Sequence, residues 1–292
     1  MLKNNYGNDM DLSELVCKTL IKSGSTFSED KVIAYKRAID LEENPQARWV
    51  LETILNNAIV ARENKSPLCD DTGIPHVVLD IGNDMEVSAE EIDSIYEGIE
   101  KGLQRLPGRP MGLLGEDLQR IDQSAGISEL SEDVLPAPIL IRRIDESVVR
   151  LHVLMLGGGP AIRAKTYRVF HKHSVEEVEK EIIKWAIEAT EKLGCTPATL
   201  AVGIGRSHYE ASSMMIQAMI DGNYDCQSEM EKRITDKVNQ SGIGSLGIGG
   251  SNTVLATFLK VGPQRASGVR IVCLRPCCCF EPRVATIELK RL

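Results

Sequence analysis

Helical and strand-like hydrophobic patterns alternate along this chain, and this alternation is the feature that most restricts its fold. In 47–58, apolar residues recur every three or four positions, as on one face of a helix. The run His76–Ile81 is short and mostly apolar, which is typical of a strand. No repeat, low-complexity segment or clean linker interrupts the mixture. We therefore predict an α/β (mixed α+β) fold in a single compact domain, with a helical N-terminal part over 1–65 and a mixed α/β part over 66–292.

Local signals place the remaining elements. Asn44 caps a helix that has Pro45 at its first position, and Ser174 with Glu177 forms a capping box at the start of a helix that ends at Gly194. Further helices are predicted at 89–106, 209–220 and 229–239. Further strands are predicted at 138–144 and 148–156, which a tight turn joins, and at 200–204, 253–261, 269–274 and 283–289. A long loop with one short helix is predicted at 107–137, which is typical of a functional or mobile segment.

The net charge excludes some classes of partner. Asp and Glu number 42 against 34 Lys and Arg, which gives a formal net charge of −8. This charge and an aromatic content of 4% argue against nucleic acid or an anionic membrane, although a local arginine cluster could still bind an anionic substrate. No run reaches the roughly 18 apolar residues of a membrane span, and the N-terminus lacks the apolar core of a signal peptide. We therefore expect a cytoplasmic protein.

Eight cysteines are the residues most able to carry chemistry. In a reducing compartment they are core residues, ligands or nucleophiles more often than disulfides. Cys69, Cys195 and the run Cys277–Cys279 each lie in a loop with glycine or proline nearby, far apart in sequence. This is not the CxxC spacing of a zinc ribbon or a ferredoxin. Three separate thiolates could instead hold three irons of a [4Fe–4S] cluster, leaving the fourth iron open as a Lewis acid.

The alternative is that these cysteines are buried as small hydrophobic residues. This interpretation suits Cys17 and Cys273, which lie within apolar elements, whereas Cys226 lies in a polar loop and is expected to be an exposed thiol. It suits three consecutive cysteines in a proline-flanked loop poorly.

Two charged positions are candidates for substrate chemistry. In Asp70-Asp71-Thr72-Gly73 at most one carboxylate can face a site, and the alternative is an Asp-Thr-Gly turn. Arg109 could bind a carboxylate with two parallel hydrogen bonds, and the alternative is an exposed loop arginine.

Two glycine clusters, at 157–159 and 242–250, could bind an anion through backbone N–H groups or form tight turns. The second cluster matches the dinucleotide pattern formally. No strand precedes it, which argues against a nucleotide fold.

Six motifs occur in the order typical of one enzyme family, and together they cover most of the chain. They are PLCDDTGIP, LPGRPMG, LMLGGGPA, LGCTPATLAVGIG, SGIGSLGIGGSNTVLA and CFEPRVA. This set resembles the alpha subunit of the class I, iron–sulfur fumarate hydratase and L-tartrate dehydratase family.

The resemblance implies a [4Fe–4S] cluster on Cys69, Cys195 and one cysteine of the final run. Cys279 is chosen because it lies four residues before Arg283 as in the family, and a register slip leaves Cys277 and Cys278 open.

The resemblance also assigns roles at the substrate. It implies proton transfer by Asp71, carboxylate binding by Arg109 and a substrate turn at Gly159. The reaction implied is the reversible addition or loss of water on a small dicarboxylate, fumarate/malate first and tartrate next. The family's second domain is implied to be a separate beta subunit, in an assembly with two copies of each chain.

This sequence departs from the family at several positions. Asp70 replaces a glutamine, Leu156 a lysine and Pro160 a serine, and VGPQRASGVRIV lacks the family's histidine. These departures keep an alternative open, a non-catalytic iron–sulfur or metal-binding protein that senses redox state.

Overall fold

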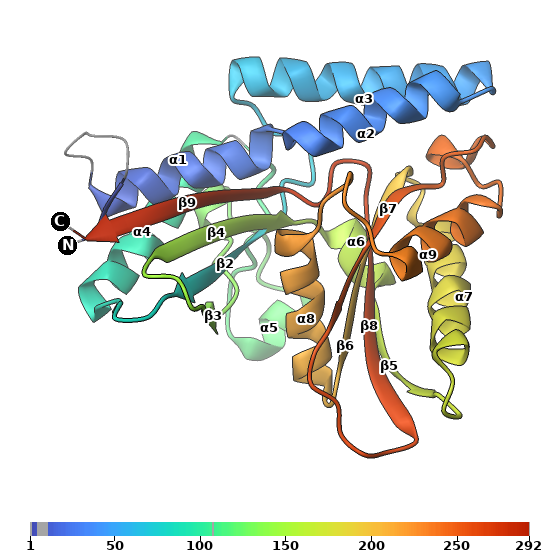
Figure 1. Ribbon diagram of the computed structural model, residues 1–292. Helices are drawn as coiled ribbons and strands as arrows, with labels where there is room; N and C mark the ends of the chain where they lie inside the picture. The colour runs from blue at the N-terminus through green and yellow to red at the C-terminus, as the bar shows by residue number, and fades with distance from the viewer. Residues whose placement is uncertain (1, 5–10, 107, 292) are drawn as a thin grey trace. The chain divides into compact units, whose positions relative to one another are not determined.

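The structure is a computed structural model that describes residues 2–4, 11–106 and 108–291. Its mixed helices and strands confirm the predicted α/β (α+β) class (Figure 1). The chain forms two interleaved compact units. Unit 1 comprises 1–26, 58–157 and 283–292, and unit 2 comprises 27–57 and 158–282. No helix of the described residues is long and apolar enough to cross a membrane.

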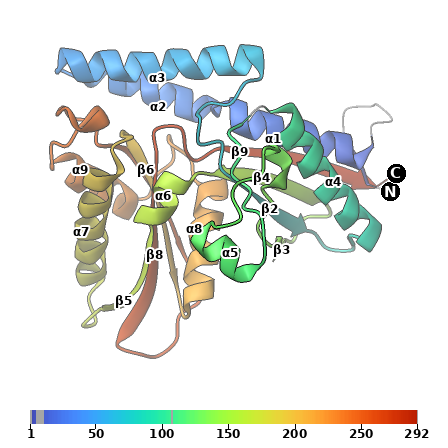
Figure 2. The same ribbon diagram turned by 180° about the vertical axis from the view of Figure 1, so that it is seen from behind.

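Unit 1 is a five-stranded sheet with two helices packed on one face. The strand order is β1 (Leu2–Asn4), β9 (Val284–Arg291), β4 (Val149–Leu156), β2 (Ile74–Ile81), β3 (Leu140–Arg143). The covering helices are α1 (Leu12–Ser25) and α4 (Ala89–Arg105), and Figure 2 shows both from behind. Val16 of α1 and Ile99 of α4 meet Leu79 and Val153 of the sheet in one buried apolar cluster, which stabilises the unit by removing apolar surface from water.

The two strands predicted at 138–144 and 148–156 exist, but they are not neighbours. Strand β2 lies between them, parallel to β3 and antiparallel to β4. The connection passes the end of β2, where Gly82 N–H donates to Val148 O (2.9 Å) and Asn83 N–H donates to Glu146 O (3.1 Å). The predicted short connection is present, but it does not make the two strands neighbours, because its carbonyl groups accept hydrogen bonds from the residues that directly follow β2.

The segment 107–137 contains, among its described residues, α5 (Asp117–Asp122) and the short 3₁₀ helix η1 (Ser131–Asp133). This confirms a loop with little regular structure.

Unit 2 is a four-stranded sheet with helices on both faces. Its strand order is β5 (Lys165–Phe170), β8 (Val269–Cys277), β6 (Ala198–Gly205), β7 (Val254–Val261). Helices α7 (Val175–Leu193) and α9 (Glu229–Asn239) share an apolar cluster with this sheet. Helix α8 (His208–Asp221) lies so close to β6 that a Cβ on Gly203 would meet Ala211 O at 2.0 Å, so only glycine fits there.

The remaining elements of the chain are α2 (Glu29–Leu41), α3 (Pro45–Asn64), α6 (Gly158–Arg163) and the 3₁₀ helix η2 (Ser245–Gly247).

Helix starts follow the predicted caps with one difference. Asn44 Oδ1 accepts from Gln46 N–H (3.0 Å) at the start of α3. Ser174 Oγ accepts from Glu177 N–H (3.3 Å), but the Ser174 N–H donates to His171 O (2.7 Å). The predicted capping box is therefore only half formed, since the N–H that Glu177 would bind is already used. Gly194 ends α7 with φ +75°, in the left-handed region that favours glycine.

Candidate functional site

The predicted site residues are divided between the two units. Unit 1 holds Cys69, Asp71 and Arg109, and unit 2 holds Gly159, Cys195 and Cys279.

In unit 1, Cys69 and Asp71 lie on the loop between α3 and β2. Thr72 N–H donates to Asp70 O (2.9 Å), so this segment does form a turn, which the sequence offered as the alternative to a catalytic carboxylate. Arg109 Nη1 donates to Asp70 Oδ2 (3.0 Å), with 53% of the arginine side chain and 74% of the aspartate side chain exposed. Arg109 therefore pairs with the first carboxylate of the motif and not with Asp71.

A buried arginine, Arg283, holds this loop against the sheet. Its Nη1 donates to Asp71 O (2.9 Å) and its Nε donates to Met155 O (3.0 Å). Gly73 has φ +91°, and a Cβ there would meet the Leu156 carbonyl carbon at 2.6 Å. The Asp71 backbone is thus fixed at the end of β4. The sequence identified Arg283 only by its spacing from Cys279.

In unit 2, the loop after α7 meets the loop after β8. Cys279 N–H donates to Cys195 O (2.9 Å), and the Cys195 thiol is close enough to act electrostatically on Cys279. Thr196 Oγ1 donates to Gly244 O (2.6 Å), and Leu246 N–H donates to Thr196 O (3.1 Å). The second glycine cluster therefore forms a tight turn, and this turn is hydrogen-bonded to the loop that carries Cys195.

The three consecutive cysteines have different surroundings. Cys277 ends β8 with no exposed surface, and its Sγ lies 3.6 Å from Met219 Sδ, so it faces the core. Burial raises the pKa of the Cys277 thiol well above its usual value. Cys278 packs at the edge of the apolar cluster. Cys279 is bonded to Cys195 through its backbone, and contact with the Cys278 thiol, with burial, raises the pKa of Cys279.

A buried lysine on α2 approaches this loop. Lys31 is 1% exposed, its Nζ donates to Glu281 O (2.8 Å), and it lies 4.3 Å from the centre of the Phe27 ring. Tyr35 Oη, one turn further on, donates to Cys279 O (2.7 Å). Burial lowers the pKa of Lys31 to about 8, against the opposing effect of the thiols of the cysteine run and of Glu281. No signal in the sequence distinguished Lys31 from a surface lysine.

Next to it, Arg275 and Glu281 form a buried ion pair. Arg275 Nε and Nη2 donate to the two carboxylate oxygens of Glu281, each at 3.1 Å. The side chains are 6% and 0% exposed. The charge of Glu281 is thus matched by Arg275.

The remaining cysteines agree with the sequence interpretation. Cys17 and Cys273 are buried, and Cys226 is exposed. Gly159 lies in α6, where a Cβ would meet nothing within 4 Å, so no close contact explains this glycine.

The donor chemistry of unit 2 fits an iron–sulfur group in part. The described residues contain no group of three or more His, Cys, Asp or Glu that could hold a metal ion. Cys195 and Cys279 are soft ligands whose backbones are hydrogen-bonded to each other, and near Cys279 lies Lys31, a buried cation that forms no ion pair among the described residues. Buried charges are normally compensated, and bound thiolates would supply the missing negative charge.

Comparison with known proteins decides the family. The family model described as fumarate hydratase (Fumerase) matches residues 13–288. The chain belongs to this family. It is therefore an enzyme of the hydro-lyase class, as the motifs indicated.

Two relatives of this fumarate hydratase family chain match nearly the whole length. The chain is 24% identical over 292 residues to the putative L(+)-tartrate dehydratase subunit alpha of Methanocaldococcus jannaschii, covering 96% of this chain and 98% of that protein. It is 20% identical over 273 residues to the L(+)-tartrate dehydratase subunit alpha of Escherichia coli K12, covering 91% and 87%.

Proposed function

We propose that this chain is the alpha subunit of a [4Fe–4S]-dependent hydro-lyase that adds water to, or removes it from, a small dicarboxylate. The substrate is fumarate/malate or, as the names of the relatives favour, tartrate. The observation that carries the proposal is the backbone pairing of Cys195 with Cys279 inside a chain whose family match runs over 13–288.

The proposed ligands are Cys69, Cys195 and Cys279. Cys277 is a poorer candidate than Cys279, because its sulfur faces Met219 in the core. When bound, such a cluster would offer one iron without a protein ligand as a Lewis acid for a substrate hydroxyl or carboxylate.

The chain's own residues would bind the substrate and move a proton. Asp71 would take or give a proton through its carboxylate, and Arg283 would hold its backbone in place. Arg109 would bind a substrate carboxylate with the guanidinium N–H groups that Asp70 leaves available. Gly159, in α6, would contact the substrate through its backbone, as the family resemblance implies.

We also propose a separate beta subunit as partner, in a cytoplasmic assembly with two copies of each chain. Both relatives are named as alpha subunits.

The test is anaerobic reconstitution with iron and sulfide, then turnover of fumarate, malate and tartrate stereoisomers with and without the partner subunit. We expect activity only with the partner present. Cys195→Ser and Cys279→Ser should lose bound iron and activity, whereas the matched control Cys226→Ser, at an exposed thiol, should keep both.

Full iron content in Cys195→Ser would contradict the ligand assignment. A reconstituted complex that holds the cluster but turns over none of these acids would favour the redox-sensing alternative.

A further inference from the structure

One face of α2, together with Phe27 two positions before its first residue, is directed at the loop after β8. Phe27, Lys31 and Tyr35 are spaced four apart, so they lie along one side of the helix. The Phe27 and Tyr35 rings stack with centroids 5.4 Å apart, and Lys31 lies over the Phe27 ring. The polar ends of Lys31 and Tyr35 both donate to backbone oxygens of this loop, those of Glu281 and Cys279. The ammonium position is therefore fixed by two contacts, with Glu281 O and with the Phe27 ring.

The charges around this loop do not balance. Glu281 is bound through both carboxylate oxygens by Arg275, which accounts for one cation and one anion. Lys31 adds a second buried cation, and the ion pairs of the described residues include none to it. The thiols of Cys278, Cys279 and Cys277 are, in that order, the neighbours whose negative charge would act most strongly on Lys31. A lysine is rarely buried in this way without a compensating anion.

We propose that Lys31 is a positioning residue for the iron–sulfur group, whose buried ammonium compensates the negative charge that ligation brings to Cys279. This inference rests on the proposed function, in that it requires a cluster at Cys195 and Cys279. A fixed cation close to a cluster favours its reduced form and retains its anionic ligands, because net charge and surrounding hydrogen bonds set the reduction potential. Lys31 would therefore slow iron loss and raise the reduction potential, without touching substrate.

The test compares Lys31→Met, which keeps the apolar stem without the charge, with two matched variants of α2. Lys36→Met removes an exposed charge from the same helix. Tyr35→Phe removes only the hydrogen bond to Cys279 O. For each reconstituted protein, iron per chain, anaerobic iron loss to a chelator and the reduction potential are measured. We expect iron loss about 10–100-fold faster and a more negative potential in Lys31→Met, in line with other outer-sphere changes. Lys36→Met should leave the potential unchanged, and Tyr35→Phe should shift it less than Lys31→Met does, because it removes a hydrogen bond but no charge.

A further variant separates charge from folding. Lys31→Gln keeps an N–H donor for Glu281 O and removes the charge, and thermal unfolding of each apo-protein measures stability. We expect Lys31→Gln to fold and still to have a more negative reduction potential than the wild type. A wild-type potential and iron-loss rate in Lys31→Met or Lys31→Gln would overturn the inference alone. The inference would also be overturned if the rate of iron loss in these variants rose only in proportion to their unfolded fraction, because the role of Lys31 would then be structural. A wild-type chain that binds no iron would overturn the proposed function and this inference with it.

Discussion

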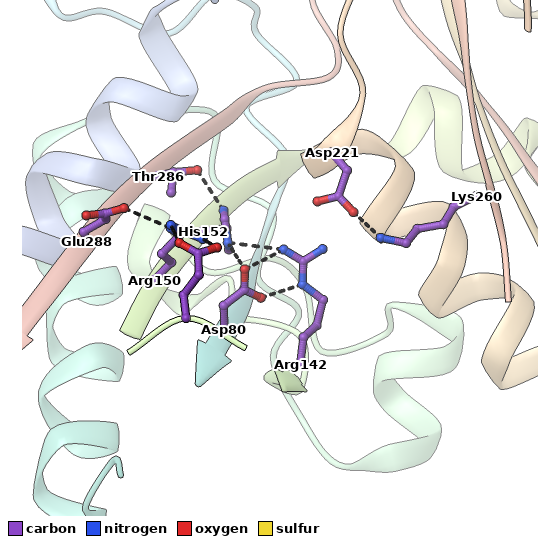
Figure 3. A network of polar contacts seen from close by, with 9 residues as sticks. Asp80, Arg142, Arg150, His152, Asp221, Lys260, Thr286 and Glu288 are labelled. Carbon is purple, nitrogen blue, oxygen red and sulfur yellow. Dashed lines mark hydrogen bonds and ion pairs between the residues drawn. The ribbon is translucent and has the colours of Figure 1, made fainter. Parts of the chain in front are cut away.

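Each unit contains a buried network of charges, and the two networks differ in balance. In unit 1, Arg142 Nε and Nη2 donate to the two oxygens of Asp80 (2.5 and 2.7 Å), and His152 Nε2 lies 2.9 Å from Asp80 Oδ2 (Figure 3). His152 Nδ1 lies 2.8 Å from Thr286 Oγ1. In unit 2, Arg275 and Glu281 are matched in the same way, but Lys31 remains without a carboxylate.

This difference in charge balance indicates that the network of unit 1 is structural, whereas the network of unit 2 belongs to a binding site. The network of Asp80, Arg142 and His152 ties together β2, β3 and β4, and both carboxylate oxygens of Asp80 and both ring nitrogens of His152 meet another protein group. Such a network can stabilise a sheet without any ligand. The loop at Cys279 has an excess of buried positive charge beside it, from Lys31, and is hydrogen-bonded to the loop of a second cysteine, which suits an anionic group supplied from outside the chain.

The largest expected effect contrasts two carboxylates of unit 1. Asp71→Asn keeps the shape of the side chain and removes the group that exchanges a proton. We expect kcat to fall about 10²–10⁴-fold at unchanged iron content, the usual contribution of a general acid or base. The matched control Asp80→Asn should leave kcat per cluster near the wild-type value. Kinetics normalised to measured iron check this, and an unchanged kcat in Asp71→Asn would reduce Asp71 to a turn residue.

The next largest effect is expected from changing the balance of buried charges in unit 2. Glu281→Gln leaves Arg275 and Lys31 as two buried cations without an anion. We expect the free energy of unfolding of the apo-protein to fall by about 3–5 kcal/mol, because a buried charge loses its partner. Denaturant unfolding measures it, with Glu229→Gln as a control at an exposed pair, where a change within about 0.5 kcal/mol is expected. If Glu281→Gln and Glu229→Gln changed the free energy of unfolding by the same small amount, the buried charges at this loop would not need Glu281 for compensation.

A smaller effect, with a defined pH dependence, is expected in unit 1. Burial alone would raise the pKa of Asp80, but hydrogen bonds from Arg142 and His152 outweigh it and hold this pKa below its usual value. The stabilisation is therefore complete above the unfolded pKa of about 3.9 and is lost as pH falls through the lower folded pKa. Asp80→Asn should reduce the free energy of unfolding by about 2 kcal/mol at pH 7.

Denaturant unfolding at several pH values tests this prediction. The difference between wild type and Asp80→Asn should shrink below about pH 4. A difference that grows with acidity would have the wrong sign for a lowered pKa.

The smallest effect is expected at the exposed pair of Arg109 and Asp70. Arg109→Lys keeps the charge and loses the planar fork, so KM should rise about tenfold with little change in kcat. Stability should hardly change, because exposed ion pairs contribute about 0–1 kcal/mol. A lower kcat at wild-type KM would instead place Arg109 in the chemical step.

Local patterns predicted the elements well because helix and strand periodicity is a property of neighbouring residues. Helix α9 occupies Glu229–Asn239 as predicted, and α4 ends one residue before the predicted boundary. The position of β2 between β3 and β4 was not predictable in this way, since it depends on pairing between residues far apart in sequence. The same limit applies to Lys31, whose partner Glu281 lies 250 residues away.

The candidate site was predictable only as a set of motifs. The sequence favoured Cys279 by its spacing from Arg283 and left Cys277 and Cys278 open as alternatives. The structure separates them by backbone direction, since Cys277 is the last residue of β8 and faces the core, while Cys279 follows in the loop and bonds to Cys195. Strand alternation of this kind becomes visible only once the end of the strand is known.

The interleaving of the two units has a consequence for synthesis on the ribosome. Strand β9 is an interior strand, hydrogen-bonded to β1 on one side and β4 on the other, yet it follows the whole of unit 2 in the chain. The sheet of unit 1 therefore cannot close until unit 2 has been translated, although α1 and β2 emerge first. Until then the edge of β4 is an unpaired row of backbone groups, which is the kind of edge that chaperones protect from aggregation.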